Sequence, residues 1–149
     1  MASGELDLNT DMHSNPIAFL REKMPGYVRT NTYLGTTTIS GGTMQVGNAG
    51  TTGTLGAGDI SIDNGAVLAT NRSNGFTITA GIDGDGKLVK LGTGLLNLGG
   101  VNTFSGGLEL QTGTLALSSN AAAGFSGGLT LGVNSSSTTT LVLAPGVTV

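Results

Sequence analysis

The sequence contains no cysteine and no tryptophan, only 3 prolines, and charged residues at 10% of its 149 positions. Without cysteine, the chain forms no disulfide and no zinc–thiolate site. No segment approaches the roughly 20 apolar residues that a membrane-spanning helix needs, and the start of the chain lacks the apolar core of a signal peptide. The net charge of −3 provides no basic surface for nucleic acid. We therefore expect no nucleic-acid partner and no membrane insertion by this chain, and no export signal within it.

Glycine and aliphatic residues are abundant instead. The 27 glycines do not follow the Gly-X-Y period of collagen, and 38% hydrophobic residues are too many for a typical disordered chain. Thr, Val, Ile and Leu, which favour strands on a half-buried pleated surface, recur throughout. The composition predicts an all-β protein with many short strands.

The first 30 residues differ from the rest, because only two of the glycines precede residue 30. A short amphipathic helix is predicted over about 16–24, with Pro16 at its first turn and Pro25–Gly26 at its end. Ile17, Leu20 and Met24 would form one apolar stripe. So short a helix needs a surface to pack on, so residues 1–30 are interpreted as a cap or assembly segment.

Residues 31–149 alternate between polar and apolar positions, which is the period of a β-strand. The segments 36–46, 59–70, 75–80, 86–92, 94–98, 107–117, 127–133 and 139–149 are predicted to be strands, with Gly, Asn, Asp or Ser between them. The D-x-D-G of the glycine-rich stretch 81–87 is interpreted as a tight turn.

This part of the chain also repeats itself. NTYLGTTTISGGTMQV (31–46) matches NTFSGGLELQTGTLAL (102–117) without a gap, and Asn31 and Asn102 open the two copies as predicted structural residues. A shorter Gly-x-apolar-x-apolar pattern begins at Gly42, Gly94 and Gly113, where bends with positive φ are expected. Such self-similarity favours a β-solenoid, whose stacked coils share one core, over a β-sandwich. The expected inward residues are Ile39, Met44, Val46, Ile60, Ile62, Val67, Ile78, Leu88, Leu96, Leu98, Leu110, Leu115 and Leu117.

The segment GDGKLVKLGTGLLNLGGVNTFSGGLELQTGTLAL resembles the autotransporter-associated β-strand repeat, also called the passenger-associated transport repeat. The resemblance covers about 31–117, with Lys90 at a repeat position and Phe104 where the family has Tyr. It implies a single-stranded, right-handed parallel β-helix in a secreted or surface-displayed bacterial protein, where the repeat supports export and display.

The stretch GIDGDGK (81–87) has the spacing of a phosphate-binding loop, but Leu88 stands where Ser or Thr should hold Mg²⁺ and a strand pattern follows. Asp83 and Asp85 are weak calcium candidates, because Gly94 occupies the position of the final Glu of an EF-hand. We therefore expect no metal and no cofactor.

Catalytic groups are sparse. Asp59 and Asp63 are the carboxylates most suited to glycoside cleavage, and a solvated rim is the simpler interpretation. His13 is the only histidine and has no cysteine to pair with. Arg72, Lys87 and Lys90 are interpreted as a small basic spot or a solvated face, with Lys87 exposed. The chain is predicted not to be an enzyme.

The predicted function is that of a structural or adhesive β-solenoid module located outside the cell or on a bacterial surface. The C-terminal VLAPGVTV has no cap signal, so self-association or continuation of a longer solenoid is expected there, and surface glycans are a further expected class of partner. Two alternatives stay open. One is a self-assembling subunit of an extracellular filament or virion, with the N-terminal segment docking on a neighbour; the other is a carbohydrate-active β-helix enzyme.

Overall fold

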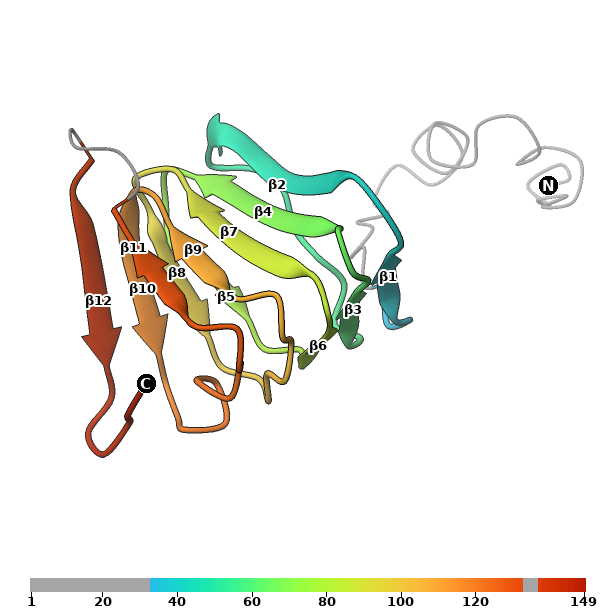
Figure 1. Ribbon diagram of the computed structural model, residues 1–149. Helices are drawn as coiled ribbons and strands as arrows, with labels where there is room; N and C mark the ends of the chain where they lie inside the picture. Colours follow the sequence, from blue (N-terminus) through green and yellow to red (C-terminus); the bar gives the residue numbers. More distant parts are fainter. Residues whose placement is uncertain (1–32, 133–136) are drawn as a thin grey trace, which may run out of the picture. The chain divides into compact units, whose positions relative to one another are not determined.

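The computed structural model describes residues 33–132 and 137–149, which belong to one compact unit, Thr32–Val149. The predicted helix over 16–24, with Ile17, Leu20 and Met24, lies outside the described residues, as do Asn31 and His13. Within the described part of the chain the secondary structure consists of β-strands and turns, with no helix (Figure 1).

The strands form three parallel sheets. Sheet 1 contains, in spatial order, β1 (Thr37–Ile39), β3 (Ile60–Ile62) and β6 (Ile82–Gly84). Sheet 2 contains β2 (Thr43–Gly50), β4 (Val67–Arg72), β7 (Lys87–Leu91), β9 (Leu108–Leu110) and β11 (Leu129–Leu131). Sheet 3 contains β5 (Phe76–Ile78), β8 (Leu95–Leu98), β10 (Gly113–Leu117) and β12 (Thr139–Leu143).

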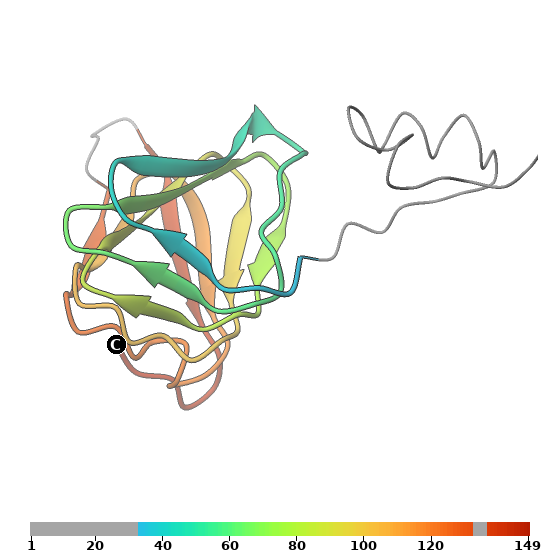
Figure 2. The same ribbon diagram turned by 90° about the vertical axis from the view of Figure 1, so that its right-hand side faces the viewer.

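Successive strands along the chain belong to different sheets, so the backbone winds around a common interior as a solenoid (Figure 2). The five strands of sheet 2 represent five successive coils. Leu88 pairs with Leu68 in the coil before it and with Leu108 in the coil after it, so one coil at this point takes 20 residues. This arrangement confirms the predicted all-β solenoid, while the right-handed winding that the resemblance implies stays a prediction.

The core consists of aliphatic side chains that stack from coil to coil. Because most coils place an aliphatic residue at the same inward positions, apolar side chains in the middle of the stack are covered by those of the coils above and below. Leu68, Leu88 and Leu108 form one such column, and all three are buried. Phe104, which is fully buried, extends the stacking with an aromatic pair: its ring lies 5.3 Å from that of Phe125, at an interplanar angle of 20°. Full burial of one such side chain contributes roughly 1.5–3 kcal/mol to folding.

Three sequence-based predictions about the strands were wrong. Leu68, not Val67, faces the core, because β4 pairs Leu68 with the inward Met44. Residues 82–84, within the predicted turn, form strand β6, because they pair with β3 although Gly84 lies in the strand and Gly81 and Gly86 are close to its ends. The last strand ends at Leu143, and a turn at 145–146 follows.

The two copies of the internal repeat lie on different sides of the solenoid. Thr37–Ile39 in sheet 1 corresponds to Leu108–Leu110 in sheet 2, and the start of β2 in sheet 2 corresponds to β10 in sheet 3. The three sheets form the three sides of the solenoid. The distance from one copy of the repeat to the other is therefore three full coils plus the step from one sheet to the next. Both copies keep the same local structure, two strands joined at a glycine of positive φ, Gly42 or Gly113.

Candidate functional site

Charged side chains occupy only the middle of the solenoid. All eight charged residues between positions 33 and 149 lie from Asp59 to Glu109. They are Asp59, Asp63, Arg72, Asp83, Asp85, Lys87, Lys90 and Glu109. The first coil before Asp59 and all residues after Glu109 carry no charged side chain.

The outer face of sheet 1 is acidic. Asp59 and Asp63 flank β3, Asp83 lies within β6 and Asp85 follows it, and all four side chains are exposed. They alternate with buried isoleucines of the same strands, so they project away from the core. The three basic residues of the described chain belong to β4 and β7 of sheet 2. The four aspartates therefore lie on a different side of the solenoid from the basic residues.

A shallow hollow of about 530 Å³ opens beside this acidic face, lined by Asp59, Thr79, Asp83, Gly100 and Thr103 among others. The Gly81 amide donates a hydrogen bond to Asp59 Oδ1 at 3.1 Å. Asp85 accepts a hydrogen bond from the Ser105 hydroxyl at 2.7 Å. Among residues 33–132 and 137–149, no three His, Cys, Asp or Glu side chains are grouped as a metal site would require.

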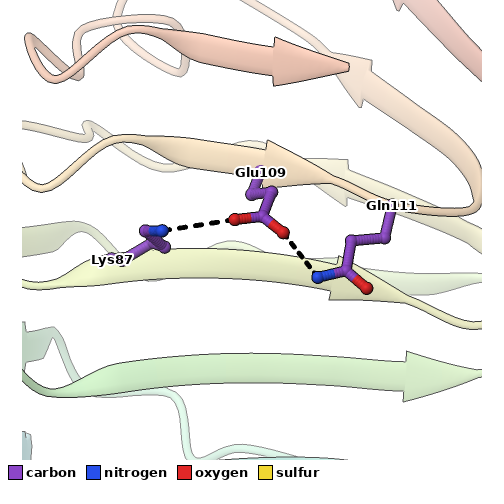
Figure 3. Close-up of polar contacts among 3 residues, drawn as sticks. All are labelled: Lys87, Glu109 and Gln111. Atoms are coloured by element: carbon purple, nitrogen blue, oxygen red, sulfur yellow. Dashed lines mark hydrogen bonds and ion pairs between the residues drawn. The ribbon is translucent and has the colours of Figure 1, made fainter. Parts of the chain in front are cut away.

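The outer face of sheet 2 carries a polar cluster. Lys87 Nζ lies 3.2 Å from Glu109 Oε2, and Gln111 Nε2 donates to Glu109 Oε1 (Figure 3). Lys87 comes from β7 and Glu109 from the adjacent β9, so the ion pair joins neighbouring coils. Lys87 is largely exposed, so the pair contributes at most about 1 kcal/mol.

Lys90 is not part of a basic surface spot, because its side chain is buried with 2% exposure. It pairs with Thr70 on the neighbouring strand and follows Leu88 by two residues on the inward side. Its ammonium group donates to the carbonyls of Leu91 at 2.5 Å, Gly92 at 2.6 Å and Thr112 at 3.2 Å. Burial away from solvent lowers the pKa of Lys90 from 10.5 to about 8. The strand alternation that places Leu88 inward also places Lys90 inward, and that signal was available in the sequence.

Arg72 is likewise engaged with its own chain. It donates to the main-chain carbonyls of Thr51 and Gly53, and its guanidinium carbon lies 5.0 Å from the centre of the Phe76 ring. These contacts fasten the segment after β2 to the next coil. Of the three basic residues grouped by sequence, Lys87 is exposed, Arg72 is partly buried and Lys90 is buried.

Asn102 is buried and connects three coils. Its Oδ1 accepts a hydrogen bond from the Ile82 amide at 3.2 Å, and its Nδ2 donates to the Ala122 carbonyl at 2.7 Å. An isolated bridge pairs Asn102 with Ile82, so it continues sheet 1 beyond β6. The side-chain amide thus supplies hydrogen bonds where the regular strand ladder ends.

The repeat glycines serve two different purposes. Gly42 and Gly113 adopt φ of 69° and 84°, a region that other residues rarely occupy. Gly94 does not have positive φ, so the expectation of a left-handed bend is wrong there. A Cβ on Gly94 would come within 2.2 Å of the Asn74 carbonyl oxygen, so close packing between coils requires this glycine.

The two ends of the solenoid differ from its sides. The first coil leaves Tyr33 and Leu34 exposed, and the last leaves Leu131 and Leu143 exposed. β2 and β11 are the outermost strands of sheet 2, and β12 is outermost in sheet 3. No helix in the described residues is long and apolar enough to cross a membrane.

Comparison with known proteins finds a partial likeness to an autotransporter adhesin. It is 36% identical over 86 residues to the adhesin BmaC autotransporter of Brucella suis biovar 1 (strain 1330). The match covers 58% of this chain and 2% of that adhesin, so the chain spans a small fraction of its relative. No protein-family model matches the chain, and no solved structure matches it. The fold and this likeness are compatible with a segment of an autotransporter-like passenger.

Proposed function

We propose that residues 33–149 form a non-enzymatic structural and adhesive segment of a surface-displayed or secreted bacterial protein. The observation that carries the proposal is the sharing of one core by successive coils. Successive coils add strands to the same three sheets, so the architecture generates length and outer surface. The likeness to an autotransporter adhesin supports a surface location.

The outer faces supply the adhesive surface. Sheet 1 presents four carboxylates, two of which, Asp59 and Asp83, line the hollow. Sheet 2 presents the cluster of Lys87, Glu109 and Gln111. Carboxylates, amides and hydroxyls on a rigid sheet offer acceptors and donors to the hydroxyl groups of a glycan. We infer that surface glycans are the class of ligand.

Binding of the full chain to fixed epithelial cells and to a glycan array tests this function. Beads coated with the purified chain are expected to bind cells above uncoated beads. A variant with Asp59, Asp63, Asp83 and Asp85 changed to Asn should bind less, and Thr77→Asn, on the exposed face of β5 in sheet 3, serves as the matched change on another face. Binding equal to that of uncoated beads would refute adhesion.

The catalytic alternative is tested separately on a panel of acidic polysaccharides. Our proposal expects no turnover from the full chain. Clear activity that disappears in Asp59→Asn would replace the adhesive function with a carbohydrate-active one.

A further inference from the structure

The C-terminal end of the solenoid is an uncharged, partly apolar edge. β11 and β12 end their sheets, and within the described residues no strand pairs with their outer edges. Leu131, with 49% exposure, and Leu143, with 38%, continue inward columns through Leu110 and Leu117. Natural proteins usually protect such edges with charges or proline, and neither is present in β11 or β12.

The described residues after β12 leave this edge open. The Ala144 amide donates to the Leu117 carbonyl, and the Thr148 amide donates to Asn120 Oδ1 at 3.0 Å. The segment 144–149 therefore follows the previous coil toward the side of sheet 1. It does not pair with the outer edges of β11 and β12.

The N-terminal coil has the sequence of a segment that docks on such an edge. Its strands β1 and β2 correspond through the internal repeat to β9 and β10, which pack on β7 and β8 of the preceding coil. Ile39, Met44 and Val46 take the inward positions of Leu110, Leu115 and Leu117. Like the C-terminal end, residues 33–58 carry no charged side chain.

We propose that the first coil of one copy docks on the last coil of a second copy, so that the solenoid continues across the junction. In this arrangement β1 pairs in parallel with β11 of the other copy, and the start of β2 pairs with its β12. The two copies of the repeat lie on adjacent sheets. The second solenoid is therefore rotated about the solenoid axis by one sheet relative to the first. Sheet 1 of one copy thereby continues sheet 2 of the next.

The junction inherits its register from the pairs already present within the chain. Leu108, Glu109 and Leu110 pair with Leu129, Thr130 and Leu131. The next coil in the same register places Thr37, Thr38 and Ile39 of the second copy against those three residues of β11. By the same continuation, Met44 and Val46 of the second copy lie against Leu141 and Leu143. The apolar contacts at both strands are thus Ile39 with Leu131, Met44 with Leu141 and Val46 with Leu143.

Disulfide trapping tests this register directly, because the natural chain has no cysteine. Adjacent parallel strands are about 4.8 Å apart, within the Cα separation that a disulfide accepts. Full chains carrying Thr38→Cys and Thr130→Cys, mixed in equal amounts and oxidised, should form a mixed dimer. Thr77→Cys, on the exposed face of β5, replaces Thr38→Cys in the control mixture and should not. Equal cross-linking in both mixtures, or preferential linking of Thr130→Cys to itself, would overturn the proposal.

Association in solution provides the second test. The full chain should associate in a concentration-dependent manner in sedimentation velocity, and Leu131→Lys should weaken association by about tenfold or more, because it buries a charge at the junction. Leu95→Lys is the matched control: Leu95 is 41% exposed, but it lies on β8 in the middle of the stack. A monomeric natural chain, or equal loss in both variants, would contradict end-to-end docking. Circular dichroism of both variants verifies that each has folded.

Discussion

Asn102 and Ile82 face each other across adjacent coils, and the Asn102 side chain accepts the Ile82 amide while donating to Ala122 one coil further on. The Ile82 amide also donates a hydrogen bond to the Val101 carbonyl at 3.2 Å. The Ala122 carbonyl accepts its side-chain hydrogen bond from the Asn102 amide. The column of Ile60, Ile82, Asn102 and Ala122 is otherwise apolar. One polar side chain therefore secures the point where sheet 1 loses its regular strands.

Asn102→Ala is expected to lower the free energy of unfolding by about 1–3 kcal/mol, because the buried Ala122 carbonyl loses the hydrogen bond from the Asn102 side chain. Urea denaturation followed by circular dichroism measures the change. Asn97→Ala is the matched control: Asn97 lies on the outside of β8, where it accepts a hydrogen bond from Ser118, and its loss should cost less than about 1 kcal/mol. Equal losses in the two variants would show that Asn102 has no special bridging role.

Phe104→Ala should lower the free energy of unfolding by about 3–5 kcal/mol, since it opens a cavity in the fully buried core. Phe125→Ala should cost less, because Phe125 is only partly buried against the same core. Thermal and urea unfolding of both variants give the comparison. A larger loss for Phe125→Ala would contradict the burial that the structure assigns to the pair.

Stability should rise with pH between about 8 and 10.5 because of Lys90. The pKa of Lys90 is about 8 in the folded protein and 10.5 when the side chain is solvated in the unfolded chain. Between pH 8 and pH 10.5 the unfolded chain therefore binds more protons than the folded protein. The charged form thus opposes folding below pH 8, and this opposition disappears as pH rises. The full gain is about 3 kcal/mol, at 1.36 kcal/mol per pKa unit.

Urea denaturation from pH 7 to pH 10.5 measures this gain. Lys90→Met should remove the rise, because no titrating group then occupies the buried position. Lys87→Met should retain it, since the Lys87 side chain is exposed on the outer face of the same strand. A slope unchanged by Lys90→Met would show that another group causes the pH dependence.

Two glycines give opposite predictions for the same substitution. Gly94→Ala should destabilise the protein by about 1–3 kcal/mol or more, because the new Cβ would overlap the Asn74 carbonyl and force the coils apart. Gly41 has open space around its Cβ position and no positive φ, so Gly41→Ala should be neutral or stabilise by up to about 1 kcal/mol. Urea denaturation of the two variants measures both changes, and a similar loss in both would refute the close packing at Gly94.

The sequence was sufficient to predict the solenoid because stacked coils repeat the same alternation of inward and outward residues. It was insufficient wherever pairing between coils overrides local propensity. Val67 and Leu68 are both strong apolar candidates, and only the pairing of Leu68 with Met44 decides which one faces inward. Residues 82–84 look like a turn because of their glycines, yet β3 provides a partner that makes them a strand.

The surroundings of Lys90 were beyond sequence reasoning for a related reason. Its partners are main-chain carbonyls of Leu91, Gly92 and Thr112. Every residue type has a main-chain carbonyl, so the sequence does not indicate which ones will bind a side chain. The acidic side was also undetected as a single surface. Its four aspartates come from two coils, and they share a face only because Ser61 and Asp83 stand in register between β3 and β6.

The repeat of three coils plus one side has a consequence for longer arrays. If 71-residue units of this kind follow one another in a chain, each unit is turned by one side relative to the unit before it. A group of surface residues repeated in each unit, such as the four aspartates of sheet 1, would then follow a helical path along the solenoid. It would return to the same side only after three units. A ligand approaching from any side would therefore meet this group of residues at regular intervals along the solenoid axis.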